Sequence, residues 1–408
     1  MKTLIYGLNF SPELTGVGKY TGELAKYLSS KKYSMKVITS PPYYPDWKVF
    51  PGYSNFFYSR EIIDRNLKVY RCPLYVPKQP SGIKRVLHLT SFILTSLPIL
   101  LSNIFWKPKV IIVVEPTFFC LLPAFILSRL VGAKLWLHIQ DFEIDAAFDL
   151  GLIKNNFLKK VLIKIESYLM SKCDRVSTIS QNMLKLAKRK GVKNSHLIFF
   201  PNWADIHLKT SSKGINNLYK TLKIKRNHTL VLYSGNMGNK QGLELLVDAA
   251  SDLRNHKDII FIFCGEGSEK FKLIQQCSHL TNVRFSELLP LNVFPSLLHI
   301  ADIHLLPQRE NVADLVMPSK LTGMLASGRP VVAVAKGSSE VAKAVKGNGI
   351  VVTPGNPKKF CDSILRLVND RELRLKLGKN ARQYALDYLD KNKILRQFER
   401  DLNQCVNL

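Results

Sequence analysis

The sequence predicts an α/β protein made of two Rossmann-like domains, each with a parallel sheet. Short apolar stretches that suit buried strands alternate with helical patterns along the whole chain, as in parallel, doubly wound sheets. The 408 residues are enough for two domains with separate hydrophobic cores. The alternation is interrupted at Pro201–Asp205 and by the polar stretch Lys209–Lys220. We therefore expect the boundary between the domains near residues 201–215.

The expected strands follow one another in a regular order. In the first half they lie at Thr3–Tyr6, Met35–Thr39, Val69–Cys72, Val110–Val114, Lys134–Ile139, Arg175–Ile179 and Leu197–Phe199. In the second half they lie at Leu230–Tyr233, Ile259–Cys264, Val283–Phe285, Ile303–Leu306, Val331–Val334 and Gly349–Val352. Helices are expected between the strands, and the last segment, Glu372–Leu402, is strongly helical.

The composition indicates which kinds of binding partner and which cellular compartment suit the chain. The chain carries 59 Lys+Arg against 31 Asp+Glu, a formal net charge of +28. Such a field favours a polyanionic partner, which could be nucleic acid, an anionic membrane face or a phosphorylated substrate. The 7 cysteines form no Cys-x-x-Cys and no His/Cys cluster. They are typical of reduced, buried thiols in a cytosolic protein.

One apolar segment, from Phe92 to Trp106, is flanked by lysine and arginine residues. About fifteen residues are too few for a comfortable membrane span, which takes roughly 20. Two interpretations remain: a helix buried in the core, or a helix that partly docks on a membrane surface with the help of its basic flanks.

A motif suited to binding a diphosphate lies between Met317 and Val331. Ser319, Lys320 and Leu321 begin a helix, which ends near Gly328. A helix start offers free N–H groups and the positive end of the helix dipole. Met317 lies in the loop just before it, and the hydroxyl of Ser319 and the ammonium of Lys320 lie on its first turn.

A second motif suited to binding phosphate follows the strand Leu230–Tyr233. There, residues 234–242 form a glycine-rich turn that contains Asn236 and one cation, Lys240. Two such strand–loop–helix junctions in one half of the chain suggest an enzyme that binds a nucleoside diphosphate.

Other polar residues follow strands at the edge where open α/β folds bind ligands. Gly16, Val17 and Gly18 follow the first strand, although this is no Gly-x-Gly-x-x-Gly fingerprint, because the third glycine position is Thr21. His138 and Asp141 lie at the end of Lys134–Ile139. Acidic residues after this strand could suggest a divalent metal, but Asp-x-Asp is absent and Lys240 can offset diphosphate charge. We therefore expect no metal and no cofactor.

Two further loops complete the predicted site. Gly265 and Glu266 lie in a turn after the strand Ile259–Cys264, which suits closure over a base or ribose and suits an ordinary loop equally well. Asp314 lies just before the diphosphate loop, where a carboxylate could accept hydrogen bonds from sugar hydroxyls.

These motifs together resemble the GT-B retaining glycosyltransferases of family 4, over essentially the whole chain. The N-terminal text is similar to that of the colanic-acid-type exopolysaccharide glycosyltransferases, often described as fucosyltransferases. The motifs that carry the resemblance are Gly7–Glu23, Pro41–Pro45, Pro73–Pro77, Lys240 in its glycine-rich turn, Gly265–Gly267, Ala301–Ile303 and Ala326–Val331.

The resemblance implies a domain organisation and roles for residues. Two Rossmann-like domains, residues 1–205 and 206–385, would face a cleft, and residues 386–408 would form a helix that returns to the N-terminal domain. Lys240 would contact the donor diphosphate and His138 would face the transferred sugar. Two positions depart from the family pattern: Asn236 stands where an arginine is usual, and Gly323 stands where the second glutamate of the Glu-seven-residues-Glu motif is expected.

The resemblance therefore implies a metal-independent hexosyltransferase with a nucleotide-sugar donor, GDP- or UDP-linked, with GDP-fucose among the candidates. The implied acceptor is a saccharide on a polyprenyl diphosphate in exopolysaccharide or capsule biosynthesis. The basic charge and the segment Phe92–Trp106 favour a cytoplasmic protein held peripherally at the anionic inner face of the plasma membrane.

Three alternatives remain: a GT-B nucleotide-sugar epimerase, a non-catalytic nucleotide-sugar-binding or assembly protein, and a nucleic-acid binder. The last is disfavoured because no stripe of interleaved basic and aromatic residues accompanies the charge.

Overall fold

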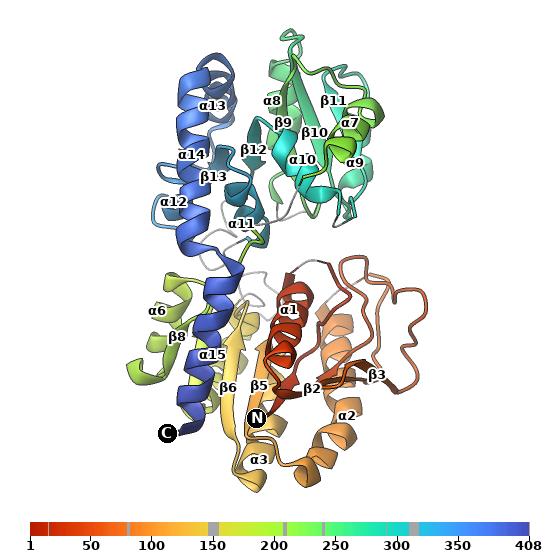
Figure 1. The fold of residues 1–408 in the computed structure, drawn as a ribbon, viewed down its shortest axis with the longest axis vertical. Coiled ribbons are helices and arrows are strands. Elements are labelled where there is room, and N and C mark those ends of the chain that lie inside the picture. Colours follow the sequence, from red (N-terminus) through yellow and green to blue (C-terminus); the bar gives the residue numbers. More distant parts are fainter. Residues whose placement is uncertain are drawn as a thin grey trace. The chain divides into compact units, whose positions relative to one another are not determined.

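The computed structural model describes residues 1–14, 16–79, 82–145, 155–206, 210–238, 241–290, 292–309 and 318–407. The chain divides into two compact units. Unit 1 comprises Met1–Pro201 together with Ile394–Leu408, and unit 2 comprises Asn202–Lys393. Each unit contains its own sheet with helices packed on it, as Figure 1 shows.

Unit 1 is built on an eight-stranded sheet in the order β3-β4-β2-β1-β5-β6-β7-β8. All neighbouring strands pair in parallel except β3, which is antiparallel to β4. The strands are β1 (Lys2–Tyr6), β2 (Ser34–Thr39), β3 (Ser59–Asp64), β4 (Leu67–Arg71), β5 (Val110–Glu115), β6 (Lys134–Ile139), β7 (Arg175–Thr178) and β8 (Leu197–Phe199). Its helices are α1 (Gly16–Ser30), α2 (Gly82–Trp106), α3 (Leu121–Val131), α5 (Asn156–Ser171), α6 (Gln181–Arg189) and the short turns η1 (Phe118–Cys120) and η2 (Asn194–His196).

Unit 2 is built on a six-stranded, fully parallel sheet in the order β11-β10-β9-β12-β13-β14. The strands are β9 (Thr229–Ser234), β10 (Ile259–Cys264), β11 (Val283–Ser286), β12 (Ile303–Leu306), β13 (Val331–Val334) and β14 (Gly349–Val352). Its helices are α7 (Ser212–Thr221), α8 (Glu244–Asp252), α9 (Lys270–Gln276), α10 (Phe294–Ile300), α11 (Ser319–Ala326), α12 (Glu340–Val345), α13 (Pro357–Asn369) and α14 (Arg371–Tyr388).

The predicted strands are all present, within one or two residues of their expected ends, because central parallel strands are nearly continuous apolar runs. The strand β3 was not predicted. It is an edge strand with mostly exposed residues, so it lacks the apolar run of a buried strand.

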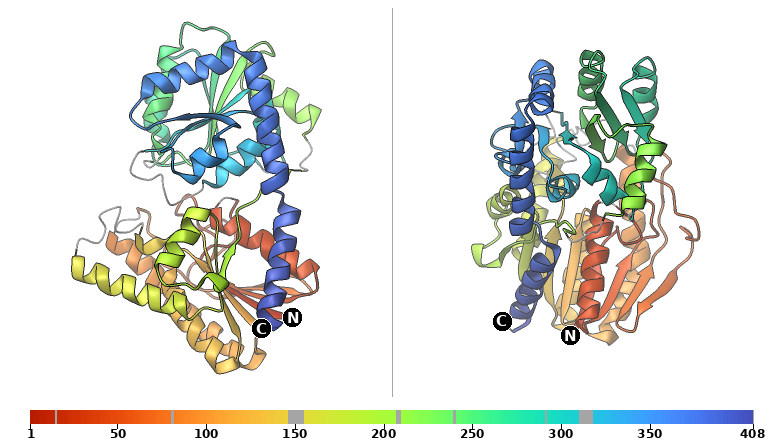
Figure 2. Two further views of the ribbon diagram at one scale, coloured as in Figure 1. Left: turned by 90° about the vertical axis from the view of Figure 1, so that its left-hand side faces the viewer. Right: turned by 45° about the horizontal axis from the view of Figure 1, so that its top comes forward.

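The C-terminal segment Glu372–Leu402, predicted to be strongly helical, forms two helices. It breaks at Leu389–Asp390, where the Asp390 carboxylate accepts hydrogen bonds from the first amides of α15 (Lys391–Asn407). Helix α15 packs on the unit 1 sheet: Phe398 lies 4.8 Å from the Trp136 ring and 4.3 Å from the Phe200 ring, measured between centroids. Figure 2 shows α15, in dark blue, running alongside the unit 1 sheet. The resemblance implied this packing.

The apolar segment expected at Phe92–Trp106 is longer than the sequence suggested. Helix α2 spans 25 residues and includes Pro98. By length and composition α2 is apolar enough to cross a membrane, with a mean hydropathy of 1.6 in its most apolar window. The interpretation as a fully buried core helix is wrong, because Ile83, Leu94 and Phe105 are exposed.

All seven cysteines are free and buried. Burial raises the pKa of each of these thiols for which a change is resolved, for example that of Cys264 to about 11. The cysteines therefore fill the cores as small apolar side chains, as the sequence predicted.

Candidate active site

Two loops at the carboxyl edge of the unit 2 sheet are packed directly on each other. The loop after β9 contains Gly235, and the loop after β10 contains Gly265. The N–H of Gly235 donates to the carbonyl oxygen of Cys264 at 2.9 Å. A Cβ on Gly265 would lie 1.9 Å from the carbonyl oxygen of Gly235, and Gly265 has φ +155°. Glycine is required here because the two backbones touch.

The polar side chains of these loops differ in their surroundings. Asn236 is exposed at the tip of the β9 loop. The Glu266 carboxylate accepts from the ammonium of Lys270 at 2.6 Å, and the Glu266 carbonyl oxygen accepts from the Met237 N–H at 2.7 Å. Any ribose hydroxyl that bound Glu266 would therefore share its carboxylate with Lys270.

Lys320, on the first turn of α11, points to the β9 loop. Its Nζ donates to Oε1 of Gln241 at 2.8 Å, lies 3.3 Å from Oη of Tyr233 and lies 4.4 Å from the centroid of the Tyr233 ring. Its aliphatic stem passes over Gly235, whose ideal Cβ would be 3.2 Å from Cδ. These partners are neutral, and burial lowers the pKa of Lys320 to about 7. An anion is the partner that would restore its ordinary pKa.

The start of α11 has no side-chain cap among the described residues. Pro318 is the N-cap residue and provides no side-chain cap, and no acidic residue lies in the first turn. Ser319 is the first helical residue. The Leu321 N–H bonds to the Pro318 carbonyl oxygen at 3.0 Å, and the Leu321 side chain is fully buried in the core. Ser319 and Lys320 thus suit an anion, whereas the role predicted for Leu321 is limited to its backbone.

Three predicted site residues, Lys240, Asp314 and Met317, lie outside the described residues. Their roles stay predictions. Lys320 and Gln241, which the structure describes, lie next to these segments along the chain.

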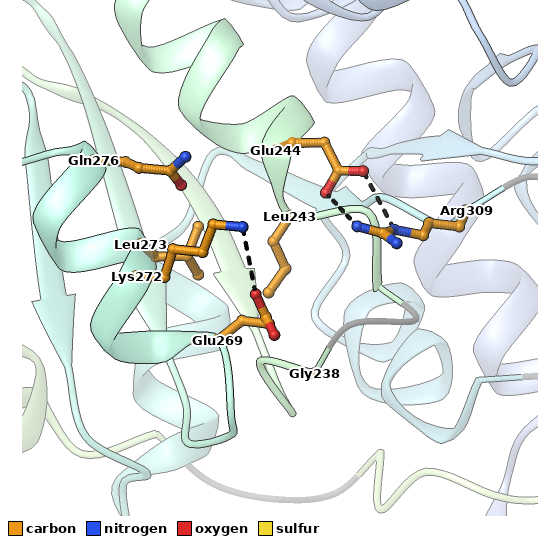
Figure 3. Close-up of a pocket in the computed structure, with 8 residues that line it drawn as sticks. All are labelled: Gly238, Leu243, Glu244, Glu269, Lys272, Leu273, Gln276 and Arg309. Atoms are coloured by element: carbon orange, nitrogen blue, oxygen red, sulfur yellow. Dashed lines mark hydrogen bonds and ion pairs between the residues drawn. The ribbon is translucent and has the colours of Figure 1, made fainter.

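An open pocket lies beside the β9 loop, as Figure 3 shows. It is lined by Gly238 and by charged side chains from α8, α9 and the residues after β12. Those charges are paired: Arg309 Nε lies 3.3 Å from Oε1 of Glu244, and Lys272 Nζ lies 4.0 Å from a carboxylate oxygen of Glu269. Because the ion pairs are internal, this pocket offers less net attraction to a phosphate than the surroundings of Lys320.

In unit 1, His138 lies at the carboxyl end of β6 and is 3% exposed. Its Nδ1 lies 2.9 Å from Oγ of Ser177, its Nε2 lies 3.0 Å from Nε2 of Gln140, and its ring lies against Phe200. Burial lowers the pKa of His138 to about 3. His138 is therefore a neutral imidazole at physiological pH. Since both nitrogens already have partners, a contact to the transferred sugar stays a prediction.

Asp141 follows β6 by two residues, beside a group of acidic side chains. Glu115 at the end of β5 is 1% exposed, and neither of its carboxylate oxygens has a hydrogen-bond partner within the described part of the chain. Burial and the neighbouring Glu166 and Glu143 raise the pKa of Glu115 well above its usual value. Among the described residues, no group of three His, Cys, Asp or Glu side chains is placed to hold a metal ion.

The glycine loop after β1 opens α1. Gly16 has φ +57°, a left-handed conformation that favours glycine. A Cβ on Gly18 would lie 2.5 Å from Oε2 of Glu13. Val17, between them, is half-buried. Gly16 and Gly18 are therefore required by the turn and by close packing on Glu13.

Glu13 connects this loop to the loop after β2. Its Oε1 accepts from the backbone N–H groups of Tyr43 and Tyr44, each at 3.1 Å, and its Oε2 accepts from Asn9 at 3.0 Å. Burial raises the pKa of Glu13 to about 7, although these hydrogen bonds and the charge of Arg71 act in the opposite direction.

Sequence reasoning did not single out Tyr233, Gln241, Glu13 or Glu115. Tyr233 was counted as a strand residue only, and Glu115 lies one residue beyond the predicted strand Val110–Val114, at the end of the observed β5. Glu13 lies within the quoted N-terminal motif, and Gln241 lies beside the predicted cation Lys240, so adjacency to a motif was the available signal.

Two units built on largely parallel sheets, and a lysine at a helix start whose described partners are neutral, are typical of α/β proteins that bind an anionic ligand beside glycine loops. The chain matches the family described as glycosyl transferases group 1 over residues 215–384, and the glycosyl transferase 4-like domain over residues 15–203. The chain belongs to this glycosyltransferase family and is an enzyme of that class, a hexosyltransferase. The resemblance stated from the motifs is confirmed.

Among its relatives is the Escherichia coli (strain K12) protein named as a colanic acid biosynthesis glycosyl transferase, WcaI. The two are 41% identical over 415 residues, which cover 98% of this chain and 100% of that protein. A probable glycosyltransferase of Pseudomonas aeruginosa, WbjE, is 27% identical over 55% of this chain and 57% of its own length.

Solved structures confirm the GT-B fold. Sucrose-phosphate synthase from Thermosynechococcus elongatus superposes with a TM-score of 0.76 at 15% identity, covering 99% of this chain and 98% of that one. The lipopolysaccharide glycosyltransferase WaaG superposes with a TM-score of 0.67 at 13% identity, covering 97% of this chain and 98% of that one. HepE of Anabaena, solved with UDP, superposes with a TM-score of 0.70 at 18% identity, covering 99% of this chain and 100% of that one.

Proposed function

We propose that the chain transfers a sugar from a nucleoside-diphosphate sugar to a hydroxyl of a lipid-linked oligosaccharide, with retention at the anomeric carbon, in exopolysaccharide biosynthesis. The observation that carries this proposal is the setting of Lys320: a half-buried lysine whose described partners are neutral, at a helix start without a side-chain cap, over the glycine loops. HepE, which shares the fold, binds UDP and UDP-glucose, and WcaI is named for colanic acid biosynthesis.

The chemistry requires a stabilised leaving group. Breaking the bond to the anomeric carbon produces an oxocarbenium-like transition state, while negative charge grows on the departing diphosphate. Lys320 and the first amides of α11 are fixed before the reaction and offset that charge, which is the most effective form of electrostatic catalysis. We assign Lys240 to the same role.

In unit 1 we assign the glycine loop Gly16–Gly18 and His138 to the reacting sugar. His138 is neutral at physiological pH, so it would orient a hydroxyl by hydrogen bonding rather than supply a positive charge. Asp141 would hold the sugar beside it. Diphosphate charge is offset by protein cations in this scheme, and no metal is invoked.

The proposed acceptor is a saccharide on a polyprenyl diphosphate at the cytoplasmic face of the membrane. The basic character of residues 1–200, with 29 Lys+Arg against 12 Asp+Glu, supports a peripheral location at an anionic surface.

Thermal-shift measurements with GDP-fucose, other GDP-sugars and UDP-sugars should identify the donor, because a ligand that binds only the folded chain raises the melting temperature. Labelled donor is then incubated with lipid-linked acceptor. Lys320→Gln should abolish both the shift and the transfer, whereas Lys358→Gln, at an exposed position of the same unit, should leave both unchanged.

Each product of this experiment supports a different function for the chain. Labelled lipid-linked product supports transfer, and its anomeric configuration tests retention. Release of an altered free nucleotide sugar would replace the proposal by an epimerase. Binding without turnover would replace it by a non-catalytic assembly role.

A further inference from the structure

Helix α2 has the reverse of the usual surface pattern. Its buried residues include the polar His88, Ser96 and Asn103, while most of its exposed residues are apolar. At about 100° per residue, the exposed apolar residues fall within an arc of roughly 100° on one side of the helix. We call this set the apolar stripe: Ile83, Val86, Leu87, Leu94, Leu101 and Phe105.

The apolar surface continues on α3, which packs beside α2. Exposed apolar residues follow one another every three or four positions in α3 and in the preceding turn η1: Phe119, Leu122, Ile126 and Leu130. The exposed Tyr58, which precedes β3, donates its hydroxyl to the Thr95 carbonyl oxygen of α2 at 2.7 Å. A soluble monomer rarely exposes so much contiguous apolar surface, so this face is expected to have a partner.

The inner side of α2 is fixed to the unit 1 sheet by polar contacts. Oγ of Ser96 bonds to Oη of Tyr6 at 2.6 Å, and Oδ1 of Asn103 accepts from Nζ of Lys36 at 3.1 Å. Removing α2 from the sheet would leave these groups without partners in an apolar medium. The helix therefore suits a position along a membrane surface rather than across it.

Four cations gather where the apolar stripe ends. We call them the cationic cluster: Lys2, Lys36, Lys68 and Arg60. They come from four neighbouring strands; Lys36 and Lys68 are register partners in β2 and β4, while Arg60 pairs with Tyr70 across β3 and β4.

Aromatic rings lie between the cations of the cluster. Nζ of Lys36 lies 4.4 Å from the centroid of Trp106 and 5.7 Å from that of Tyr70. Nζ of Lys2 donates to the Trp106 carbonyl oxygen at 2.8 Å. Cζ of Arg60 lies 5.8 Å from the Tyr70 ring. Among the described residues, none of the four cations forms an ion pair with a carboxylate.

The four cations of the cluster repel one another, and this repulsion contributes to a lowered pKa of Lys36. Burial, and then the charges of Lys68, Arg60 and Lys2, lower the pKa of Lys36 to about 8. Like charges that converge without a carboxylate favour an external anion. The cluster contacts Trp106 at the C-terminal end of α2, where the apolar stripe also ends, so the anion that fits best is the phosphate of a lipid whose chains meet the apolar stripe.

We propose that this face of unit 1 docks on an anionic phospholipid bilayer, with the apolar stripe at the interface and a lipid phosphate bound in the cationic cluster. This inference deepens the peripheral location proposed above and rests on it. It names the surface and the lipid chemistry that would present unit 1 to a lipid-linked acceptor.

Vesicle flotation of the full chain tests the proposal. The chain should float with vesicles that contain phosphatidylglycerol and much less with phosphatidylcholine alone. Arg60→Gln combined with Lys68→Gln should lower the partition coefficient about 30-fold, since each cation contributes about fivefold near an anionic surface. The matched control, Lys358→Gln with Lys359→Gln in unit 2, should leave it unchanged.

The apolar stripe has its own pair of variants. Leu101→Ser with Phe105→Ser should lower the partition coefficient about tenfold or more, because apolar side chains leave the interface. Phe271→Ser, which changes an exposed aromatic residue in unit 2, should have no effect.

Several results would overturn the proposal. These are equal flotation with both lipids, unchanged flotation of either double variant, release only by detergent after alkaline washing, or self-association that depends on Phe105. Displacement by inorganic phosphate at matched ionic strength would show a site for free phosphate instead. Thermal shifts with nucleotide sugars on the same variants separate this outcome from the proposed function, because docking variants should bind donor normally.

Discussion

Replacing Lys320 by methionine should stabilise the empty protein and remove its nucleotide binding. The pKa of Lys320 is about 7 in place of the ordinary 10.5. At about 1.4 kcal/mol per pH unit, this difference corresponds to about 5 kcal/mol. The Lys320 side chain is partly exposed and solvent screens its charge, so the expected cost is about 2–3 kcal/mol.

The sign of the pH dependence follows from linkage. Between pH 7 and 10.5 the unfolded chain binds more protons at Lys320 than the folded chain, so stability rises with pH across this window. Below pH 7 both states carry the proton and the full cost remains. Lys320→Met should therefore raise the melting temperature of unit 2 by about 4–8 °C at pH 6.5, and by less at pH 9.5.

Differential scanning fluorimetry at the two pH values checks this, with Lys358→Met as the control for loss of one exposed lysine. Calorimetry in buffers of different ionisation enthalpy provides a second measurement. At pH 8, nucleoside diphosphate binding to the parental chain should take up about 0.9 proton, because the anion restores the charge of Lys320. A Lys320→Met melting temperature equal to or below the parental value at pH 6.5, or unchanged proton uptake in that variant, would refute the reasoning.

Other predictions concern the loops and unit 1. Gly265→Ala should lower stability by about 2 kcal/mol or more and weaken donor binding, because its Cβ would meet a backbone oxygen at 1.9 Å. The control is Gly337→Ala, which has open space around it. In thermal-shift titrations this control should change neither stability nor donor binding. Glu13, with its pKa raised to about 7 by burial, makes the parental chain lose stability as pH rises from 4.5 to 7; Glu13→Gln should flatten this dependence in melting curves at pH 5 and 8, and an unchanged slope would contradict the assignment. His138, with a pKa of about 3, does not change charge between pH 5 and 8; His138→Gln should lower turnover without moving the acid limb of the pH–rate profile.

Much of the fold follows from the sequence because its determinants are local. A run such as Ile259–Cys264 is apolar at every position, and such a run suits a central parallel strand. Strand β3 has no such apolar run, because it lies at the edge of the sheet with one partner strand and its other edge in solvent. The first part of α2 was missed because residues 82–91 carry Lys84, Arg85 and His88, so the apolar run that marks the helix begins only at Phe92.

The candidate site was predictable in part. The helix start at Ser319 and the glycine loops have sequence signatures, because turns and helix ends require particular residues. The contact of Lys320 with Tyr233 and Gln241 joins residues about eighty positions apart. Such pairings depend on sheet order, which no local pattern encodes.

Because every native thiol is enclosed in a core, thiol-reactive dyes would find no accessible target on the parental chain. A single cysteine introduced at an exposed position, such as F105C, would thus accept a polarity-sensitive fluorophore without removal of any native cysteine. Its emission could report in real time whether the end of α2 meets hydrocarbon or water.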